Sequence, residues 1–450
     1  MIHNVFLSFR VAVLLVTVMG AWNTPALLGQ ENAPLEASKS PIEWLTRQIT
    51  PNALVPEPAP QRRRLVLSYK PVEESSPLLQ KSFVYDAALS AIAFSLSGHR
   101  EKAALVLHAL ARQIRPDGSL WFSYNTKNTW PDEMSHDFGQ VRGGAIAWCG
   151  YAFSLYLDMF PPKNTDPTGL ARERVRFLKA ATDLAEYLLS LQIQDPTSQR
   201  YGLMLGGWGR VGLRFNSQRG EVEEVYSPGP VPFVSTENNI SIYFFLTKLA
   251  KITGEDRYAR AAESIAQSLV RALWDESRAQ FWMGFNGPDE VNRGGALDCA
   301  SWGALFWLAR GDSDRARRSL ETARQLYWNR DGPAQGHRPY YDWPIYEDRK
   351  VGEWFFPDAP AKQWKDLPIV WSEGSLGVAL AYLRLENKKQ ATEILEGLKP
   401  LIQEDGGLLY ASRDVPYHFS SLPSVAGTAW WVFLQEALED PDRLPHFLNH

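Results

Sequence analysis

The chain has 450 residues, 45% of them apolar and 22% charged, so it can bury a large core. Its 47 Lys and Arg nearly balance its 51 Asp and Glu, and the lack of a long basic run argues against nucleic acid as the main partner. Two cysteines exclude a disulfide framework and a cysteine-built zinc site, whereas 17 tryptophans leave indole rings for roles beyond the core.

Residues 1–30 have the pattern of an export signal peptide. Arg10 precedes an apolar run over residues 11–19, and small residues follow at positions 20, 21 and 26. The run is short for a bilayer span, so we expect cleavage near residues 26–30, with an uncleaved anchor as the alternative. Eight prolines in residues 31–80 indicate a Pro-rich linker, interrupted by a short helix around residues 42–49. The mature protein is therefore expected to be secreted or periplasmic, without membrane contact after cleavage.

Hydrophobic periodicity predicts almost purely helical structure from residue 83 onward. The helices come in pairs: the first member is apolar nearly all round, whereas the second has one apolar stripe, such as Ala261, Ile265 and Leu269. We therefore predict a buried inner helix followed by a half-exposed outer helix in each pair. The predicted pairs are 83–98 with 100–114, 139–160 with 169–193, 236–253 with 255–274, 297–310 with 312–328 and 371–386 with 388–403, followed by a helix over 421–438.

The connections between these helices differ in length. Inner-to-outer connections are short and carry a glycine where a helix C-terminus favours one, at Gly98, Gly254 and Gly311. Outer-to-inner connections are long and aromatic, and the two longest, 196–235 and 329–370, exceed the usual length of structureless loops. Six inner helices with outer partners close naturally into an all-α fold, an α/α barrel, with long aromatic loops at one end. The helix around 42–49 is a candidate for the missing sixth outer partner.

Five short strings stand at or near the predicted starts of the inner helices. They are Tyr-Asp-Ala-Ala at 85–88, Val-Arg-Gly-Gly-Ala-Ile-Ala-Trp at 141–148, Ser-Thr-Glu-Asn-Asn at 235–239, Trp-Ser-Glu-Gly at 371–374 and Ser-Val-Ala-Gly-Thr-Ala-Trp at 424–430. With the helix layout, they resemble the six-hairpin glycosidase superfamily of secreted carbohydrate-active enzymes over residues 83–440. The resemblance implies a six-hairpin toroid and a polysaccharide or oligosaccharide partner. It assigns residues 81–450 to one α/α-barrel catalytic domain.

Acidic residues recur at the starts of the inner helices, at Asp86, Asp137, Glu237, Asp298 and Glu373. All inner N-termini lie at one end of such a barrel, where the long loops also gather, so we expect these carboxylates to converge on one rim. The alternative is that they only stabilise their helices, because an acid in the first turn contributes about 0.3–1 kcal/mol through the helix dipole. Some outer helices also begin with acids, which supports that alternative in part.

Glycoside hydrolysis requires two carboxyl groups in different states. One stays protonated to give a proton to the leaving oxygen, and the other activates water or attacks the anomeric carbon. Glu237 is our first choice for the acid, because apolar residues around it favour a raised pKa. Glu373 and Asp137 compete for the role of base, and Asp86 ranks third. The resemblance implies inversion, with the catalytic pair roughly 6.5–9.5 Å apart.

Sugar-binding sites combine flat aromatic rings with carboxylates, amides and arginine, and the predicted rim offers this mixture. The candidate substrate-binding residues are Trp121, Tyr124, Arg142, Trp208, Asn238, Asp298, Tyr341, Trp343 and Trp371. The loop tryptophans among them could equally anchor the loops. Four tryptophans within helices are expected in the core instead, namely Trp148, Trp302, Trp430 and Trp431.

Three alternatives to a secreted glycoside hydrolase stay open. A polysaccharide lyase acting on a uronic-acid polymer could use Arg142, His136, His418, Tyr417 or Tyr124. A two-histidine epimerase and a non-catalytic glycan-binding protein are the others. We expect no cofactor and no transition metal from the spacing, although loop aspartates leave calcium open, and Cys149 and Cys299 are expected as buried free thiols. The sequence lacks a Gly-x-Ser-x-Gly elbow and a phosphate-binding glycine loop, which disfavours esterase and nucleotide chemistry.

Overall fold

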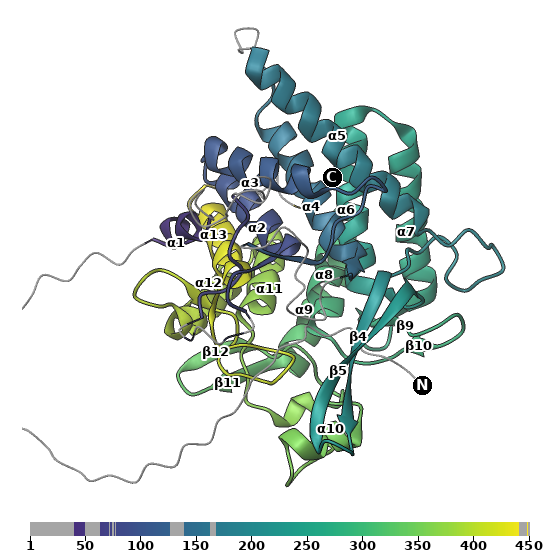
Figure 1. Ribbon diagram of the computed structural model, residues 1–450, viewed down its shortest axis with the longest axis vertical. Helices are drawn as coiled ribbons and strands as arrows, with labels where there is room; N and C mark the ends of the chain where they lie inside the picture. The colour runs from purple at the N-terminus through teal and green to yellow at the C-terminus, as the bar shows by residue number, and fades with distance from the viewer. Residues whose placement is uncertain are drawn as a thin grey trace, which may run out of the picture.

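A computed structural model describes residues 40–49, 64–71, 73, 76, 78–126, 139–162, 168–440 and 448 (Figure 1). The predicted export signal lies outside the described residues. Thirteen α-helices occur in the described part of the chain, together with short strands, so the predominantly helical class is confirmed. None of the described helices has the length and apolar character needed to span a membrane.

Six helices form a closed inner ring. They are α2 (Val84–Leu96), α4 (Gly143–Met159), α6 (Thr236–Thr253), α8 (Leu297–Ala309), α11 (Ser372–Arg384) and α13 (Val425–Glu439). Each contacts the next in this order, and α13 contacts α2. Their side chains are buried on nearly every side; in α4, every residue from Gly143 to Leu157 is buried. Apolar character all round a helix is therefore what places it in the inner ring.

The outer helices each pack on the inner helix that precedes them in the chain. They are α3 (Arg100–Gln113), α5 (Thr168–Ser190), α7 (Asp256–Leu273), α9 (Ser313–Thr322) and α12 (Lys388–Leu398). A π-helical turn (Ala323–Tyr327) continues α9, and 3-10 turns lie at Trp364–Asp366 and Lys399–Leu401. The helix pairs thus begin within a few residues of the predicted positions.

Helix α1 (Pro41–Gln48) occupies the sixth outer position, against α13. Ser40 and Glu43 form a capping box at its start, which fixes where the helix begins. Trp44 and Leu45 are fully buried on the side that faces the barrel. Residues 64–71, within the segment predicted as linker, also lie against the barrel, where Leu65 and Val66 are buried.

Three inner-to-outer connections contain a glycine in the left-handed region: Gly98 (φ 74°), Gly254 (φ 71°) and Gly311 (φ 78°). Gly254 ends α6, and its N–H donates to the carbonyl oxygen of Ala250 at 2.8 Å. A side chain at residue 254 would meet no atom within 4 Å, so only the backbone conformation requires glycine there.

Gly254→Ala is therefore expected to lower the free energy of unfolding by about 1–2 kcal/mol, the penalty for a left-handed L-residue. Gly169→Ala is the matched control, because Gly169 lies within α5, has an exposed position and also has open space around it. The control should leave stability unchanged or raise it. Urea denaturation of both variants measures the difference, and equal effects would contradict the explanation.

The outer-to-inner connections contain small antiparallel sheets that sequence periodicity did not predict. The strands are β1 (Lys81–Phe83), β2 (Ser123–Asn125), β3 (Val141–Arg142), β4 (Gly207–Asn216), β5 (Glu221–Val231), β6 (Val234–Ser235), β7 (Trp274–Asp275), β8 (Gln280–Phe281), β9 (Gly284–Phe285), β10 (Val291–Asn292), β11 (Trp328–Asp331), β12 (Ala334–His337), β13 (Leu408–Leu409) and β14 (Pro423–Ser424). Strands β1, β3, β6 and β14 lead directly into the inner helices α2, α4, α6 and α13. Pairing of these strands with the loops fixes the start of each helix.

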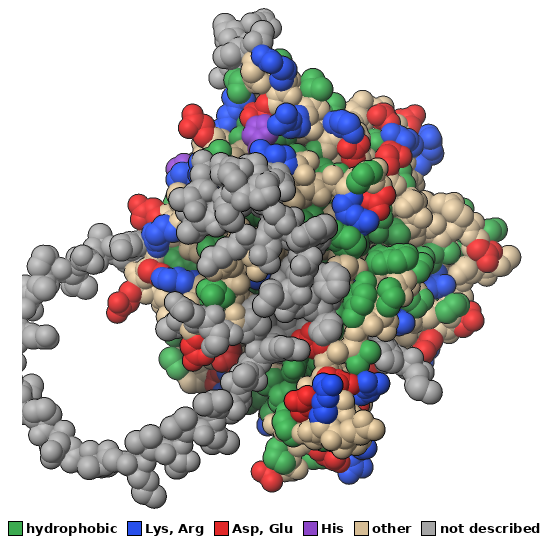
Figure 2. All heavy atoms as spheres, viewed as in Figure 1, with side chains coloured by type: hydrophobic (Ala, Val, Ile, Leu, Met, Phe, Trp, Pro, Cys, Tyr) green, Lys and Arg blue, Asp and Glu red, His purple; other side chains and the backbone are tan. Residues whose placement is uncertain are grey.

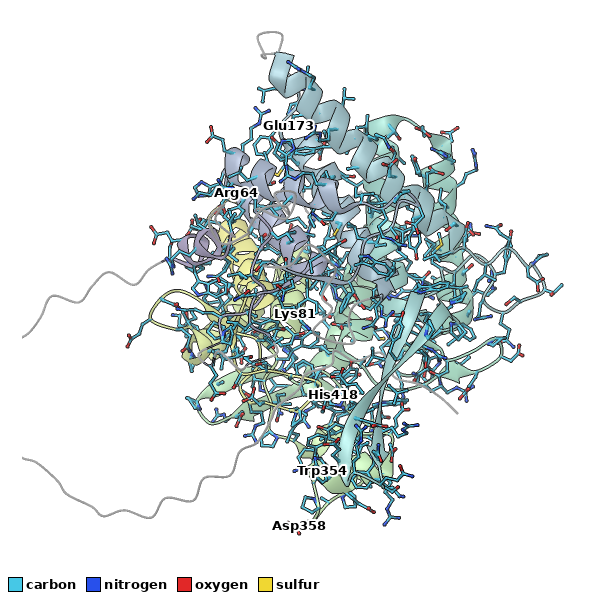
Figure 3. The ribbon with its side chains drawn as sticks, in the orientation of Figure 1. Arg64, Lys81, Glu173, Trp354, Asp358 and His418 are labelled. Carbon is cyan, nitrogen blue, oxygen red and sulfur yellow. The ribbon has the colours of Figure 1, made fainter. Side chains whose placement is uncertain are left out.

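The two longest connections form a projection beside the barrel, at the bottom of Figure 1. The first folds into the β4–β5 hairpin, and the second contains α10 (Arg349–Phe355), which packs on that hairpin. Phe215 and Trp354 join the two, with ring centroids 5.9 Å apart. Trp354 and Asp358 lie at the outer end of the projection (Figure 3). These connections are therefore ordered elements and not structureless loops.

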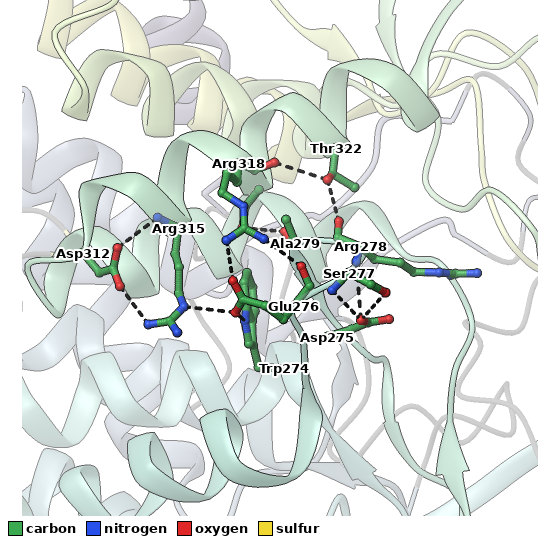
Figure 4. A network of polar contacts seen from close by, with 11 residues as sticks. Trp274, Asp275, Glu276, Ser277, Arg278, Ala279, Asp312, Arg315, Arg318 and Thr322 are labelled. Atoms are coloured by element: carbon green, nitrogen blue, oxygen red, sulfur yellow. Dashed lines mark hydrogen bonds and ion pairs between the residues drawn. The ribbon is translucent and has the colours of Figure 1, made fainter.

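Charged residues on the outside of the barrel tie the turn after α7 to α9 (Figure 4). The Glu276 carboxylate accepts hydrogen bonds from Arg318 and from Trp274, and these donors lower its pKa to about 2. Exposed pairs of this kind contribute little to stability because water screens them. On the face shown in Figure 2, acidic and basic side chains are interspersed outside the grey atoms.

Candidate active site

A cavity of about 240 Å³ opens at the N-terminal ends of the inner helices. All six inner helices contribute side chains to its wall, and each does so from its first six residues. The inner helices therefore begin at the same end of the ring, around one shared cavity. Residues that precede the inner helices also line it, among them Tyr69 and Phe83 before α2 and Tyr410 and Phe419 before α13.

Four carboxyl groups line this cavity. Asp86 is the third residue of α2, and Glu237, Asp298 and Glu373 are the second residues of α6, α8 and α11. The structure thus brings together four of the five acids expected at the rim, and Asp137 lies outside the described residues.

None of these four acids is the N-cap of its helix. The N-cap positions belong to Phe83, Ser235, Ala296 and Trp371. At α6 the Ser235 hydroxyl accepts the backbone N–H of Asn238 at 3.2 Å, so the cap is complete without Glu237. The four carboxyl groups are therefore available to the cavity, although they still lie at the positive ends of their helix dipoles.

Burial raises the pKa of two of these acids to about 7. Glu237 owes its raised pKa to burial, and no hydrogen bond to its carboxyl group occurs among the described residues. Burial likewise raises the pKa of Asp86, against a hydrogen bond from Ser68 that favours the ionised form. At Glu237 no donor offsets the cost of burying the carboxylate, so its pKa stays raised.

The other two acids have stronger electrostatic coupling to their neighbours. The pKa of Glu373 is raised to about 8: burial is the largest cause, the charges of Asp86 and Glu237 add to the rise, and hydrogen bonds from Tyr85 and Tyr410 oppose it. The pKa of Asp298 lies well above its ordinary value, because of burial first and then the charges of Glu237 and Glu373. Like charges in one cavity favour sharing of protons among the four groups.

Tyr85 links Glu373 to the floor of the cavity. Its hydroxyl donates to Oε1 of Glu373 and accepts Nε1–H of Trp430 at 3.5 Å. The hydrogen bond that Glu373 accepts from Tyr85 fixes the carboxyl group in one orientation and favours its ionised form. This arrangement distinguishes Glu373 from Glu237 more clearly than burial does.

Arg142, predicted to bind substrate, lines the cavity with its donors directed at the protein. Nη1 donates to the carbonyl oxygens of Trp208 at 3.1 Å and of Gly209 at 2.7 Å, and Nη2 donates to the Gln140 amide oxygen. The guanidinium group therefore joins the start of α4 to the β4 strand. The same contacts weaken the lyase alternative, which needs this group to neutralise a uronate.

Among the predicted substrate-binding residues, Arg142, Asn238, Asp298 and Trp371 line the cavity. Five others are absent from its described wall, namely Trp121, Tyr124, Trp208, Tyr341 and Trp343.

These five aromatic residues mostly support the loops. Trp121 lies beneath the Arg115 guanidinium, whose central carbon is 4.1 Å from a ring centroid, and the Tyr124 hydroxyl accepts the Trp121 backbone N–H at 3.3 Å. Tyr341 packs edge-on against Tyr327, and the Trp343 ring lies where a side chain at residue 294 would stand. Trp208 keeps 42% of its surface exposed. The structure therefore does not bring these five residues to the described wall of the cavity, and for most of them packing within the loops uses the apolar faces.

Three tryptophans assigned to the core from sequence also form part of the cavity wall. They are Trp148, Trp302 and Trp430, each the sixth residue of its inner helix. All three are buried, so the prediction that they belong to the core is confirmed. The sequence analysis did not predict that each ring also turns one face to the cavity. Their common position in α4, α8 and α13 is a regular spacing from which they could have been identified.

Most of the remaining aromatic and polar residues of the wall were not predicted as substrate-binding, and His418 was considered only for the lyase alternative. The cavity is also lined by Tyr69, Tyr85, Gln140, Tyr340, Tyr410, His418 and Phe419. Tyr69 and Tyr410 pack edge-on with centroids 6.0 Å apart, although 341 residues separate them in sequence. No local signal predicts such a contact, because it depends on closure of the ring.

No protein-family model matches the sequence, and no curated protein matches it. The solved structures that the chain resembles include a glycosidase, with a TM-score of 0.56 at 12% identity over 89% of this chain and 95% of that chain. A D-mannose isomerase gives a TM-score of 0.53 at 14% identity over 88% and 95% of the two chains. A GH76 alpha-mannanase of Bacteroides thetaiotaomicron gives 0.51 at 12% identity over 90% and 98%. Likeness at such low identity is a statement about architecture, and the chain shares the overall fold of these solved structures.

Proposed function

We propose that the protein is an exported glycoside hydrolase that cleaves a polysaccharide or oligosaccharide by carboxylate acid/base catalysis with inversion. The observation that carries this proposal is the group of four carboxyl groups, Asp86 buried and the other three partly buried, all with a raised pKa, in one aromatic-lined cavity. Glycosidases among proteins of the same fold support it. We also propose that the six helix pairs correspond to the six hairpins of a six-hairpin α/α barrel.

Glu237 takes the role of general acid. Burial without a hydrogen-bond donor raises its pKa to about 7, so a substantial fraction of the molecules keeps the proton at neutral pH, as a group that protonates the glycosidic oxygen requires. Loss of that proton to the leaving oxygen leaves a carboxylate, which the helix dipole at the start of α6 stabilises.

Glu373 takes the role of general base. The Tyr85 hydroxyl donates to Glu373 and stabilises its ionised form, and a protonated Glu237 removes one of the charges that raise its pKa. The Glu373 carboxylate then accepts a proton from a water molecule, whose oxygen attacks the anomeric carbon on the face opposite the leaving group. One bond to oxygen forms as the glycosidic bond breaks, so the configuration inverts. Asp86 is the second candidate for this role, because Ser68 also favours its ionised form.

Incubation with a panel of glycans tests the reaction. Reducing ends should appear without new ultraviolet absorbance, because hydrolysis forms no C=C bond. Absorbance that rises with product would instead identify a lyase, and binding without either signal would identify a glycan-binding protein. Sequencing the N-terminus of the exported protein tests the predicted cleavage near residues 26–30.

Tyr85→Phe is expected to move the acidic limb of the kcat/KM pH profile to higher pH, by roughly one pH unit. The Tyr85 hydrogen bond opposes the rise in the pKa of Glu373, so its removal raises that pKa further and the base ionises later. Tyr258→Phe is the matched control, because the Tyr258 hydroxyl donates to Glu186 at 3.0 Å outside the cavity. An unmoved limb in Tyr85→Phe would remove Glu373 from the role of base.

A further inference from the structure

The cavity wall has two layers at different depths. The carboxyl groups belong to the second or third residue of their helices, whereas Trp148, Trp302 and Trp430 are sixth residues. A helix rises 1.5 Å per residue, so the indole rings stem from about 6 Å further down the barrel. This is about the depth of one pyranose ring.

The three indoles close the bottom of the cavity. Their centroids are 5.4 Å apart for Trp148 and Trp302, 5.5 Å for Trp302 and Trp430, and 6.0 Å for Trp148 and Trp430. Each pair meets edge to face, with interplanar angles of 70–75°. Because α4, α8 and α13 alternate around the ring, the rings meet near its axis. The cavity is therefore a blind pit, which a glycan chain cannot pass through.

Gly377 leaves space beside this floor. It is the sixth residue of α11, and a Cβ there would find only the Ser301 hydroxyl within 4 Å, at 3.9 Å. Its backbone is helical, so the conformation does not require glycine. Glycine inside a helix costs about 0.5–1 kcal/mol relative to alanine. The glycine thus lowers helix stability slightly but leaves open volume at the bottom of the pit.

Acidic groups outnumber basic groups in the described wall of the pit. Among the described residues of its wall, Asp86, Glu237, Asp298 and Glu373 face one guanidinium group, whose donors reach protein oxygens. His418 is the other basic side chain of the described wall, and burial lowers its pKa to about 3, so it is neutral at physiological pH. A carboxylate on a bound sugar would therefore meet acids without a free counter-charge.

We propose that the pit binds one uncharged sugar ring at the non-reducing end of a glycan, between the carboxyl layer and the tryptophan floor beside Gly377. This inference rests on the proposed hydrolase function. The anomeric carbon of the bound ring then faces the carboxyl layer, and the rest of the glycan leaves through the mouth as the leaving group. The enzyme would release single sugars from chain ends.

Oligosaccharides labelled at the reducing end test the mode of action. Neutral gluco-, manno- and galacto-oligosaccharides should release a monosaccharide from the first turnover, with a labelled chain one unit shorter. The same oligosaccharides ending in a uronic acid should react at least roughly tenfold more slowly. Internal fragments appearing first, or equal rates on the uronic-acid chains, would overturn the proposal.

Gly377→Val tests the place of binding, since it fills the space beside the floor. We expect kcat/KM to fall at least roughly tenfold, chiefly through KM, while the thermal midpoint is kept. Gly377→Ala, which suits the helix, should show a smaller fall in the same direction, and it decides the question where the valine variant does not fold. Gly169→Val, on an outer helix, is the matched control and should not change kcat/KM. Unchanged KM in both variants at residue 377 would overturn the proposal.

Direct binding separates this inference from the proposed reaction. Glucose, mannose and galactose are titrated against wild type and Gly377→Ala with tryptophan fluorescence as the signal. If no glycan in the panel is cleaved, the hydrolase function fails, yet monosaccharide binding that the variant weakens still supports the terminal-ring site. A fluorescence signal that no monosaccharide changes would overturn it.

Discussion

Glutamine at residue 237 or 373 should lower kcat/KM by about 10²–10⁴-fold, the usual contribution of a positioned general acid or base. The amide has the shape of the carboxyl group but can neither give the proton that the leaving oxygen needs nor accept one from water. Both residues lie in the first turn of an inner helix and line the same cavity. Initial rates on a cleaved glycan measure the loss.

The two variants should differ in their pH profiles. Without Glu237 the fall in activity on the alkaline side should disappear, because that fall reports loss of the acid's proton. Without Glu373 the rise on the acidic side should disappear, because that rise reports ionisation of the base. Leaving groups that need no protonation should restore activity to Glu237→Gln alone.

Glu101→Gln provides the matched control. Glu101 also lies in the first turn of its helix, but α3 is an outer helix and the residue is exposed. Its loss should cost only the helix-dipole contribution of about 0.3–1 kcal/mol in stability and leave activity unchanged. Near-full activity in both Glu237→Gln and Glu373→Gln would show that this pair is not the catalytic one.

Trp44→Ala should lower the free energy of unfolding by about 3–5 kcal/mol, the usual cost of emptying a fully buried large aromatic site. Trp44 lies on α1, the helix that covers α13. A Cβ at Gly407 would lie 2.4 Å from its indole nitrogen, so the ring fills its site closely. Urea denaturation gives the free energy.

Trp44→Phe keeps an aromatic ring and should lose markedly less stability than the alanine variant. A loss below about 1 kcal/mol in Trp44→Ala would mean that α1 is not an integral outer helix of the barrel.

The helix pairs were predictable because their burial follows directly from composition. Inner helices such as α6 are buried on all sides, so their sequences are apolar nearly all round, and outer helices such as α7 expose one side. Each inner-to-outer turn adds a glycine signal, as at Gly254. Local physics therefore determines where most helices begin and end.

The β4–β5 hairpin was not predicted, because the long connection 196–235 was treated as a loop. Its register pairs Arg214 with Glu223 and Val211 with Tyr226. Half-buried strands leave only weak alternation, with Val211 buried but Trp208 exposed. Partners such as α10, from more than 100 residues away, decide which side of the hairpin is covered.

The carboxyl groups of the site could be found from sequence, whereas most of its aromatic wall could not. An acid at the start of an inner helix follows from helix boundaries alone, as at Glu237 and Glu373. Which rings face the acids depends on the rotation of each helix about its axis and on the loops packed over it. Tyr410 and Tyr69 illustrate this, since they meet only when the ring closes by packing of α13 on α2.

The segment carrying Ser68 and Tyr69 is hydrogen-bonded to the residues at the start of α13. The Val425 N–H donates to the Ser68 carbonyl oxygen at 2.9 Å, and the Lys70 N–H donates to the Pro423 carbonyl oxygen at 3.1 Å. A nascent polypeptide that has not yet reached residue 425 lacks both these partners and the last wall of the pit. The cavity wall is thus incomplete until α13 has been synthesised, and truncation before α13 should yield products without the complete cavity however well their earlier helices pair.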